Sequence, residues 1–190
     1  KKDSSYDNLS EGEKLSNSLA SMGTTFIKLG QFLATRPDII GDGLSKELES
    51  LQDKLPPFSQ SKAKEMIRND LGDEIYNSII NISEPVAAAS IAQVHKAQID
   101  DNGVIKDVAI KILRPDIKKI FNEEVDALML FAFIIESLIK KTKRLKLVEV
   151  VFLLKEITSL EMDLRFEAAA ANEYAENTKN DLGFEVPKIY

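Results

Sequence analysis

The side chains that could support chemistry begin with a lysine and a glutamine in an apolar segment. Lys28 and Gln31 lie about one helical turn apart, and Thr24 and Thr35 fall on the same stripe at about 100° per residue. A helix this apolar has little surface to give to water, so we expect its polar stripe to face the interior of the fold. A lysine there needs an anion, because an unpaired buried charge is costly. The anion could be a carboxylate of the chain or a phosphate of a ligand.

A second lysine, Lys111, ends the sequence V-A-I-K at positions 108–111, in a β-rich run. In protein kinases this tetrapeptide lies on the third strand, and its lysine contacts the α- and β-phosphates of ATP. The match is short, and a strand-end lysine in solvent is the alternative interpretation.

The segment 85–90, which precedes this strand, contains no glycine. It holds four small residues instead: Ala87, Ala88, Ala89 and Ser90. A kinase covers the ATP phosphates with a glycine-rich loop at the corresponding place. Alanine restricts the backbone more than glycine does, so a loop of this composition would be stiffer. The alternative is that the small residues permit tight packing at the start of a strand.

The densest acidic cluster between apolar positions holds Glu161, Asp163 and Glu167. On one helix Asp163 and Glu167 would share a face, and Glu161 could pair with Arg165 four residues later. Ordinary salt bridges on a solvated helix would explain this pattern. In the functional interpretation the acids meet the two lysines, and the helix must bend or begin here if Glu161 and Asp163 reach one partner.

Composition excludes several classes of protein. The formal net charge of −6 argues against nucleic-acid binding, and the absence of cysteine excludes disulfides and thiolate catalysis. The single histidine, His95, excludes histidine metal clusters and is expected to be a packed or partly exposed strand residue. The apolar run 127–139 is too short to span a bilayer. The basic cluster at 140–146 is either a solvated helix end or a membrane-surface or partner contact.

The order of elements predicts a mixed fold. Residues 1–80 have helical spacing, Pro56-Pro57 breaks the pattern, and Ser59 or Ser61 could cap the next helix. A β-hairpin is expected from two runs joined by the turn-like residues 100–103. We then expect long helices over about 115–143 and 147–178, and a strand near Glu185. The end of the chain looks like the start of a strand inside a larger protein.

Together these pieces resemble the UbiB/ADCK family of atypical protein-kinase-like proteins. The matching segments are 28–38 (K-x-G-Q), 51–57, the alanine-rich stretch 85–95, Lys111, Glu161-x-Asp163 (E-x-D) and Glu167. The resemblance implies an α+β fold, a kinase-like N-lobe with a small antiparallel sheet and helix C. It implies a helical K-x-G-Q extension at 1–80 and an N-lobe at 81–190 that contains an inserted helix at about 115–144 and the helix C region at about 147–178.

The resemblance also implies roles for the residues. Lys111 and Glu167 would form the supporting ion pair of a nucleotide site, which Lys28, Gln31, Glu161, Asp163 and the 87–90 segment would line. The expected activity is ATP or ADP binding with slow hydrolysis, and magnesium would bind in the full-length protein. A catalytic-loop aspartate and a D-F-G aspartate do not occur here, so a kinase C-lobe is absent and no metal site or hydrolysis is expected of these 190 residues alone.

The implied function is support of ubiquinone (isoprenoid-lipid) biosynthesis, with this chain as the nucleotide-positioning half. The alternative is a non-enzymatic pseudokinase scaffold for quinone-biosynthesis proteins. The expected partners are a nucleotide and lipid or quinone-precursor pathway proteins. The expected location is cytoplasmic, peripheral to or anchored at the inner membrane, with membrane contact through a region C-terminal to the chain.

Overall fold

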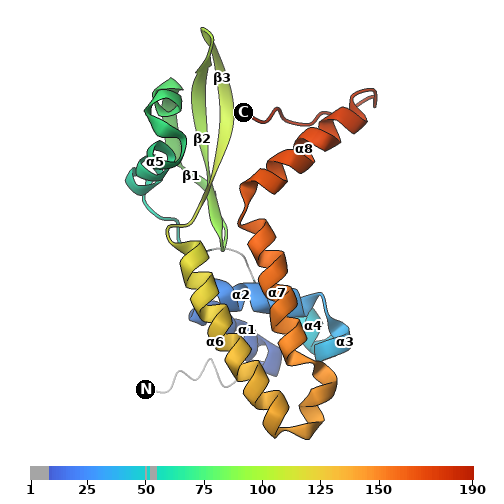
Figure 1. The fold of residues 1–190 in the computed structure, drawn as a ribbon. Coiled ribbons are helices and arrows are strands. Elements are labelled where there is room, and N and C mark those ends of the chain that lie inside the picture. The colour runs from blue at the N-terminus through green and yellow to red at the C-terminus, as the bar shows by residue number, and fades with distance from the viewer. Residues whose placement is uncertain (1–8, 50, 52–54) are drawn as a thin grey trace. The chain divides into compact units, whose positions relative to one another are not determined.

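The computed structural model describes residues 9–49, 51 and 55–190. Its internal contacts divide the chain into two compact units, Lys1–Phe121 and Asn122–Tyr190, and each is described by itself below. Figure 1 shows the elements in chain order. The predicted α+β class is confirmed, with a small three-stranded antiparallel sheet that follows a set of helices.

The first unit begins with short helices that share one apolar core. They are α1 (Glu11–Met22), α2 (Thr24–Ala34), α3 (Pro37–Ile40) and α4 (Asp42–Leu48). Ser10 caps α1, because its hydroxyl accepts from the amide of Glu13 at 3.1 Å while the Glu13 carboxylate accepts from the amide of Ser10 at 2.8 Å. The core residues are Leu19, Ile27, Leu48 and Leu51.

Gly30 in α2 lies where no side chain would fit. A Cβ atom built there would be 2.6 Å from Leu51 Cδ1 and 2.9 Å from Leu19 Cδ1. The glycine therefore lets α2 pack closely against two leucines of this core, while Lys28 and Gln31 lie on the neighbouring stripe of the same helix and are half-buried.

The second part of the first unit is α5 (Gln60–Ser78) and a sheet of β1 (Ile79–Ala88), β2 (Ala92–Asp101) and β3 (Val104–Leu113). Ser59 caps α5 by accepting from the amide of Lys62, as the sequence predicted. The strands lie in the order β1-β2-β3 and all neighbours are antiparallel. The β2–β3 hairpin matches the predicted one, and Asn102 and Gly103 adopt positive φ in its turn.

Strand β1 was not predicted as a strand of its own. It begins at Ile79, directly after α5, and contains Pro85. Proline has no backbone N–H to donate to a neighbouring strand. It is tolerated here because β1 is an edge strand with register shifts on either side of Pro85.

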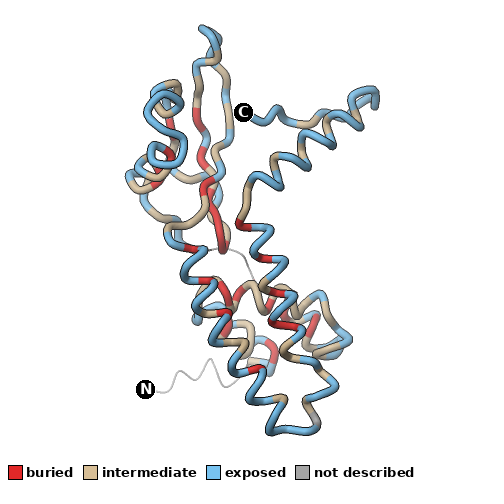
Figure 2. Tube along the Cα trace, in the orientation of Figure 1, coloured by how far each residue is buried: buried red, intermediate tan, exposed pale blue. Residues whose placement is uncertain are grey.

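One face of the sheet packs under α5, and the other face lacks this cover. Ala63 and Ile67 of α5 join Ile82, Ala97 and Ile112 of the three strands in one buried cluster. Figure 1 shows α5 beside the sheet, and Figure 2 shows buried positions following β2 through its centre. The opposite face carries exposed residues, among them Lys96, Asp107, Ala109 and Lys111.

The second unit consists of most of α6 (Ile117–Leu138), a 3₁₀ helix at Lys140–Leu145, α7 (Leu147–Glu161) and α8 (Leu164–Thr178). The expected single helix over 147–178 is wrong, because the chain breaks at Met162-Asp163 and Asp163 caps α8. The expected strand near Glu185 is also wrong. A strand needs a partner for its backbone hydrogen bonds, and residues 182–190 pair with none of the three described strands.

None of the helices in the described ranges combines the length and the apolar composition that crossing a membrane requires.

The contact at Gly30 gives a stability prediction. Gly30→Ala should lower the free energy of unfolding by about 1–3 kcal/mol, because the added methyl group overpacks the contact with two leucines. This loss should outweigh the gain in helix propensity that alanine gives, about 1 kcal/mol.

Gly43→Ala is the matched control, since Gly43 lies in α4 and a Cβ atom there would meet nothing within 4 Å. Urea unfolding of both variants measures the difference. Equal stability of the two variants would show that the Gly30 contact is not a constraint.

Candidate functional site

The first feature of the candidate site is the position of Lys111 on the face of the sheet opposite α5. Side chains alternate along a strand, so Lys111, Ala109 and Asp107 share this face. In the register of the hairpin, Lys111 pairs with Val94 and Ala109 pairs with Lys96. Lys111 is exposed.

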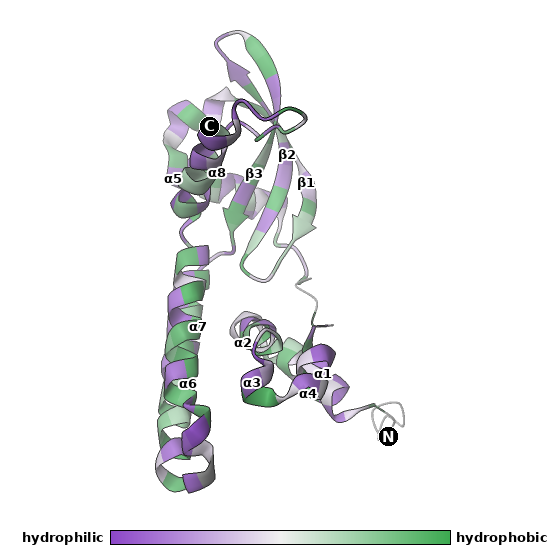
Figure 3. Ribbon diagram, turned by 90° about the vertical axis from the view of Figure 1, so that its right-hand side faces the viewer, coloured by the Kyte–Doolittle hydropathy of each residue, from purple (hydrophilic) through white to green (hydrophobic). Residues whose placement is uncertain are grey.

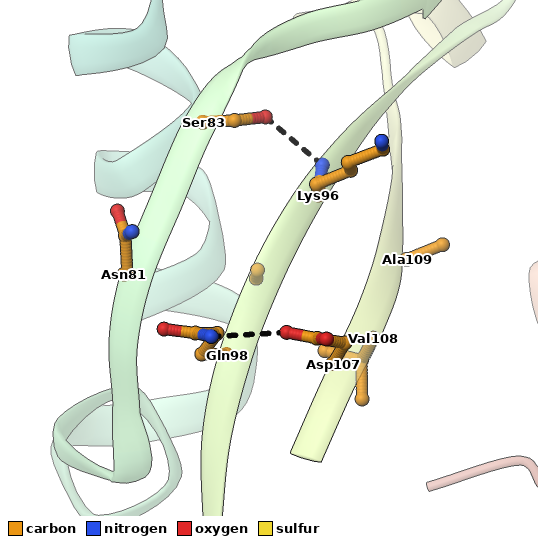
Figure 4. A pocket seen from close by; sticks show the side chains of 8 residues that line it. Asn81, Ser83, Lys96, Gln98, Asp107, Val108 and Ala109 are labelled. Atoms are coloured by element: carbon orange, nitrogen blue, oxygen red, sulfur yellow. Dashed lines mark hydrogen bonds between the residues drawn. The ribbon is translucent and has the colours of Figure 1, made fainter. Parts of the chain in front are cut away.

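A hollow of about 510 Å³ lies on the sheet next to this position. Figure 4 shows its lining side chains, which come from all three strands. They are Asn81, Ser83, Lys96, Ala97, Gln98, Asp107, Val108 and Ala109. The Gln98 side chain donates to Asp107 at 3.0 Å across β2 and β3 and so fixes the polar end of the hollow. Sequence reasoning missed this lining, although the alternation of β3 already puts positions 107, 109 and 111 on one face.

The alanine-rich segment is a strand end and a tight turn. Ala87 and Ala88 end β1, where they pair with Val94 and Gln93, and the amide of Ala89 donates to the carbonyl of Ala92 at 2.8 Å. Ser90 is fully buried in the turn. A glycine-free segment therefore forms a closed turn between β1 and β2.

Two side chains from other segments bind the carbonyl groups of this turn. Arg114 donates through Nε to the carbonyl of Ala89 at 2.9 Å and through NH1 to the carbonyl of Pro56 at 3.0 Å. The hydroxyl of Thr24, at the start of α2, donates to the carbonyl of Ser90 at 3.1 Å. The turn is thus tied both to the linker before α5 and to the helix that carries Lys28.

The same linker is held by a buried polar network. The Gln93 side chain accepts from the amide of Phe58 at 3.0 Å and donates to the carbonyl of Phe58 at 3.1 Å. It also lies 2.8 Å from Nε2 of His95, whose Nδ1 lies 2.8 Å from the carbonyl of Ser83. A carbonyl only accepts, so Nδ1 carries the proton and Nε2 accepts from Gln93. His95 is a packed strand residue, as expected, with no exposed surface.

Hydrogen bonds within the first unit explain the positions of the two threonines in the polar stripe of α2. Thr24 reaches the turn through Ser90, whereas Thr35 is exposed and donates to the carbonyl of Phe32 in its own helix. Lys28 and Gln31 lie between these two threonines and are half-buried.

The acids at 161–167 are divided between two helices. Asp163 accepts two hydrogen bonds from the guanidinium of Arg165, at 2.8 and 2.5 Å. It accepts a third from the backbone amide of Arg165. These bonds raise the pKa of Arg165 above its ordinary value. The expected pairing of Glu161 with Arg165 at helical spacing is wrong, because Glu161 ends α7 and Arg165 lies in α8. Glu161 and Glu167 are exposed.

Lys28, Gln31, Lys111 and the 87–90 segment belong to the first unit, whereas Glu161, Asp163 and Glu167 belong to the second. The meeting of the lysines with the acids therefore stays a prediction. Among the described residues, no group of three or more acidic or histidine side chains could hold a metal ion.

Comparison with known proteins gives consistent matches. A sequence model of the ABC1 atypical kinase-like domain matches residues 50–190. The probable protein kinase UbiB of Tolumonas auensis is 36% identical over 97% of the chain, and that of Marinobacter nauticus is 36% identical over 95%. The corresponding Vibrio cholerae protein is 35% identical over 94%. The chain spans about a third of the length of these relatives.

The Arg114 contacts predict a local loss of order in Arg114→Lys. A lysine ammonium group is a point charge and does not reproduce the fork that reaches the carbonyls of Ala89 and Pro56. We expect faster hydrogen exchange at the amide of Ala89 and a loss of about 1–3 kcal/mol in unfolding free energy.

Arg68→Lys is the control, since Arg68 lies exposed on α5 and its bonded partner is Asp73, only five residues later in the chain. Hydrogen exchange by NMR measures both variants. Unchanged exchange at Ala89 in Arg114→Lys would mean that Arg114 does not order the turn.

Proposed function

Because the chain belongs to the ABC1 atypical kinase-like family, we propose that the whole protein containing it binds ATP or ADP as a UbiB-type kinase-like ATPase. We further propose that this activity supports ubiquinone (isoprenoid-lipid) biosynthesis. The relatives are named probable protein kinases, and the chain covers about a third of their length.

The observation that carries the proposal is Lys111, exposed on the open face of the sheet and two residues from Ala109 at the edge of the hollow. A phosphate group of the nucleotide would pair with the Lys111 ammonium group, and the planar base would lie against the small side chain of Ala109. The hollow of about 510 Å³ falls in the range of small-molecule sites, about 300–1,000 Å³.

The remaining residues receive roles from the family resemblance. Glu167 would support Lys111 as an ion-pair partner, and the 87–90 turn would cover the phosphates. Lys28, Gln31, Glu161 and Asp163 would line the nucleotide from the K-x-G-Q extension and the E-x-D segment. The hydrogen bond from Thr24 to the carbonyl of Ser90 supports this role for the extension, since it joins α2 to the turn. Magnesium, which proteins often hold through one or two carboxylates and the phosphates of the nucleotide, would bind in the full-length protein.

Slow hydrolysis without protein phosphorylation follows from the same proposal. An extension that lies against the nucleotide-covering turn occupies space where a kinase would admit a peptide. The bound nucleotide would then meet water or a small lipid-pathway substrate more readily than a protein hydroxyl.

Lys111→Ala in the full-length protein should abolish nucleotide binding, because the phosphates lose their cation. The wild-type protein at a ligand concentration of about 100 Kd should gain about 2.7 kcal/mol of stability, and the variant should gain none. Thermal unfolding with and without ATP measures this gain.

Lys118→Ala, at an exposed position in the first turn of α6, is the control and should keep the full gain. A Lys111→Ala protein that ATP still stabilises fully would refute the nucleotide site. A wild-type protein that ATP does not stabilise would favour the pseudokinase scaffold.

Ala87→Gly should loosen the covering segment and change the ratio of ATP to ADP affinity or permit autophosphorylation. Ala87 is exposed and lies next to a register shift in β1, so glycine there frees the backbone without removing a packed side chain. Calorimetric titration with both nucleotides measures the affinities, and ³²P incorporation measures autophosphorylation.

Ala169→Gly, at an exposed position in α8, is a matched change outside the turn. Identical affinities and no phosphorylation in Ala87→Gly would show that the stiffness of this segment does not control the nucleotide.

A further inference from the structure

The hairpin of α6 and α7 exposes many large apolar side chains. Phe131 and Phe133 are each 62% exposed, and Leu138 is 77% exposed. We call the following six residues the apolar face: Leu130, Phe131, Phe133, Leu138, Phe152 and Leu160. Soluble surfaces rarely present apolar side chains this densely unless the surface contacts another molecule or a membrane.

The two helices are joined by specific bonds in addition to the turn between them. Lys155 on α7 donates to Asp126 on α6 at 2.9 Å, and the amide of Val148 donates to the carboxylate of Glu136 at 3.2 Å. Each helix also has its own buried apolar positions, such as Ala132 on α6 and Leu154 on α7. The apolar face is therefore an addition to the residues that hold the hairpin.

The distribution of the exposed residues on α6 favours a continuous apolar medium. Leu130, Phe131, Phe133, Ile134 and Ile135 occupy nearly consecutive positions and are all exposed. Successive residues of a helix point about 100° apart, so these side chains spread around much of the circumference. A single partner helix or groove would cover one stripe, at spacings of three and four. The acyl boundary of a bilayer accepts a broad apolar surface of this kind without a matching groove.

The turn of the hairpin carries only positive charges. Between Glu136 and Glu149 the sequence contains five lysines and arginines and no acid. Lys143 and Arg144 are exposed, and Lys146 binds Glu149. Figure 3 shows α6 and α7 mostly green and the turn between them purple, so the cations adjoin the apolar stretch.

We propose that the α6–α7 hairpin lies in the interface of an anionic lipid bilayer, with the apolar face at the acyl boundary and the basic turn on lipid phosphates. Amphipathic helices with apolar and basic surfaces bind anionic membranes in this way, and several clustered cations strengthen the attraction. The proposal does not depend on nucleotide binding.

Vesicle co-sedimentation of the 190-residue chain tests the proposal. The chain should bind vesicles of equal parts phosphatidylcholine and phosphatidylglycerol at low salt, and should bind phosphatidylcholine alone at least about tenfold more weakly. Phe131→Ser with Phe133→Ser, and separately Lys143→Glu with Arg144→Glu, should each weaken binding to the mixed vesicles by at least about tenfold.

Two double variants serve as matched controls. Val104→Ser with Ile105→Ser changes apolar side chains that are 57% and 63% exposed on the β2–β3 hairpin. Lys118→Glu with Lys119→Glu reverses two exposed cations of the first turn of α6. Both controls should bind the mixed vesicles as the unchanged chain does, and circular dichroism should show that all four double variants are folded.

A fluorescent reporter distinguishes insertion from adhesion. The chain has no tryptophan, so Phe133→Trp places a single indole on the apolar face. Its emission should shift to shorter wavelength with mixed vesicles, and that of Val104→Trp should stay unchanged.

Three results would each overturn the proposal. They are no binding to mixed vesicles, equal weakening by the control variants, and an unshifted Phe133→Trp spectrum in a sedimenting protein. A fourth is a concentration-dependent dimer, seen by light scattering, that Phe131→Ser with Phe133→Ser abolishes, since a second copy would then cover the apolar face.

Discussion

The fully buried amide of Gln93 pairs with both backbone groups of Phe58, and much of the first unit depends on this pairing. Phe58 precedes α5, so the pairing fixes where the linker from the first four helices meets β2. His95 holds the second amide hydrogen of Gln93, which leaves the network satisfied in the buried interior. Arg114 then joins the same linker to the turn after β1. The turn is ordered by contacts from distant segments, and this explains how it stays closed without glycine.

Because side chains alternate along each strand, one face of the sheet packs against α5 and the other face carries the candidate site residues. Ile82, Ala97 and Ile112 face α5. The lining of the hollow includes the neighbouring positions Asn81, Ser83, Lys96 and Gln98. A change of one residue in register would bury Lys111 under α5 and expose the core. The β2–β3 register is continuous over ten pairs, from Ala92–Leu113 to Asp101–Val104, so the position of Lys111 is strongly determined.

Local pattern was sufficient to predict some of these features and not others. Alternation and the residues Asn102-Gly103 predicted the hairpin, because turn chemistry acts over a few residues. The sequence predicted one helix over 147–178 and a break near Met162-Asp163 only if Glu161 and Asp163 reach one partner. The break was not predicted outright, because the apolar spacing continues through it. The bonds of Arg114 and Gln93 could not be predicted, because they join positions 25 to 58 residues apart. The acids and lysines were recognised by their motifs, and they belong to two different units, so their meeting stays a prediction.

Helix α8 contains no buried residue, although it carries Glu167. Local interactions contribute to its order: the Asp163 cap, the run of four alanines at 168–171, and the edge-to-face contact of Tyr174 with Phe184. A helix of 15 residues with only such local support would be marginal by itself in water. The apparent affinity of any molecule that binds only the helical form is reduced by the fraction of α8 that is not helical. The position of the Glu167 carboxylate is thus linked thermodynamically to whatever covers α8.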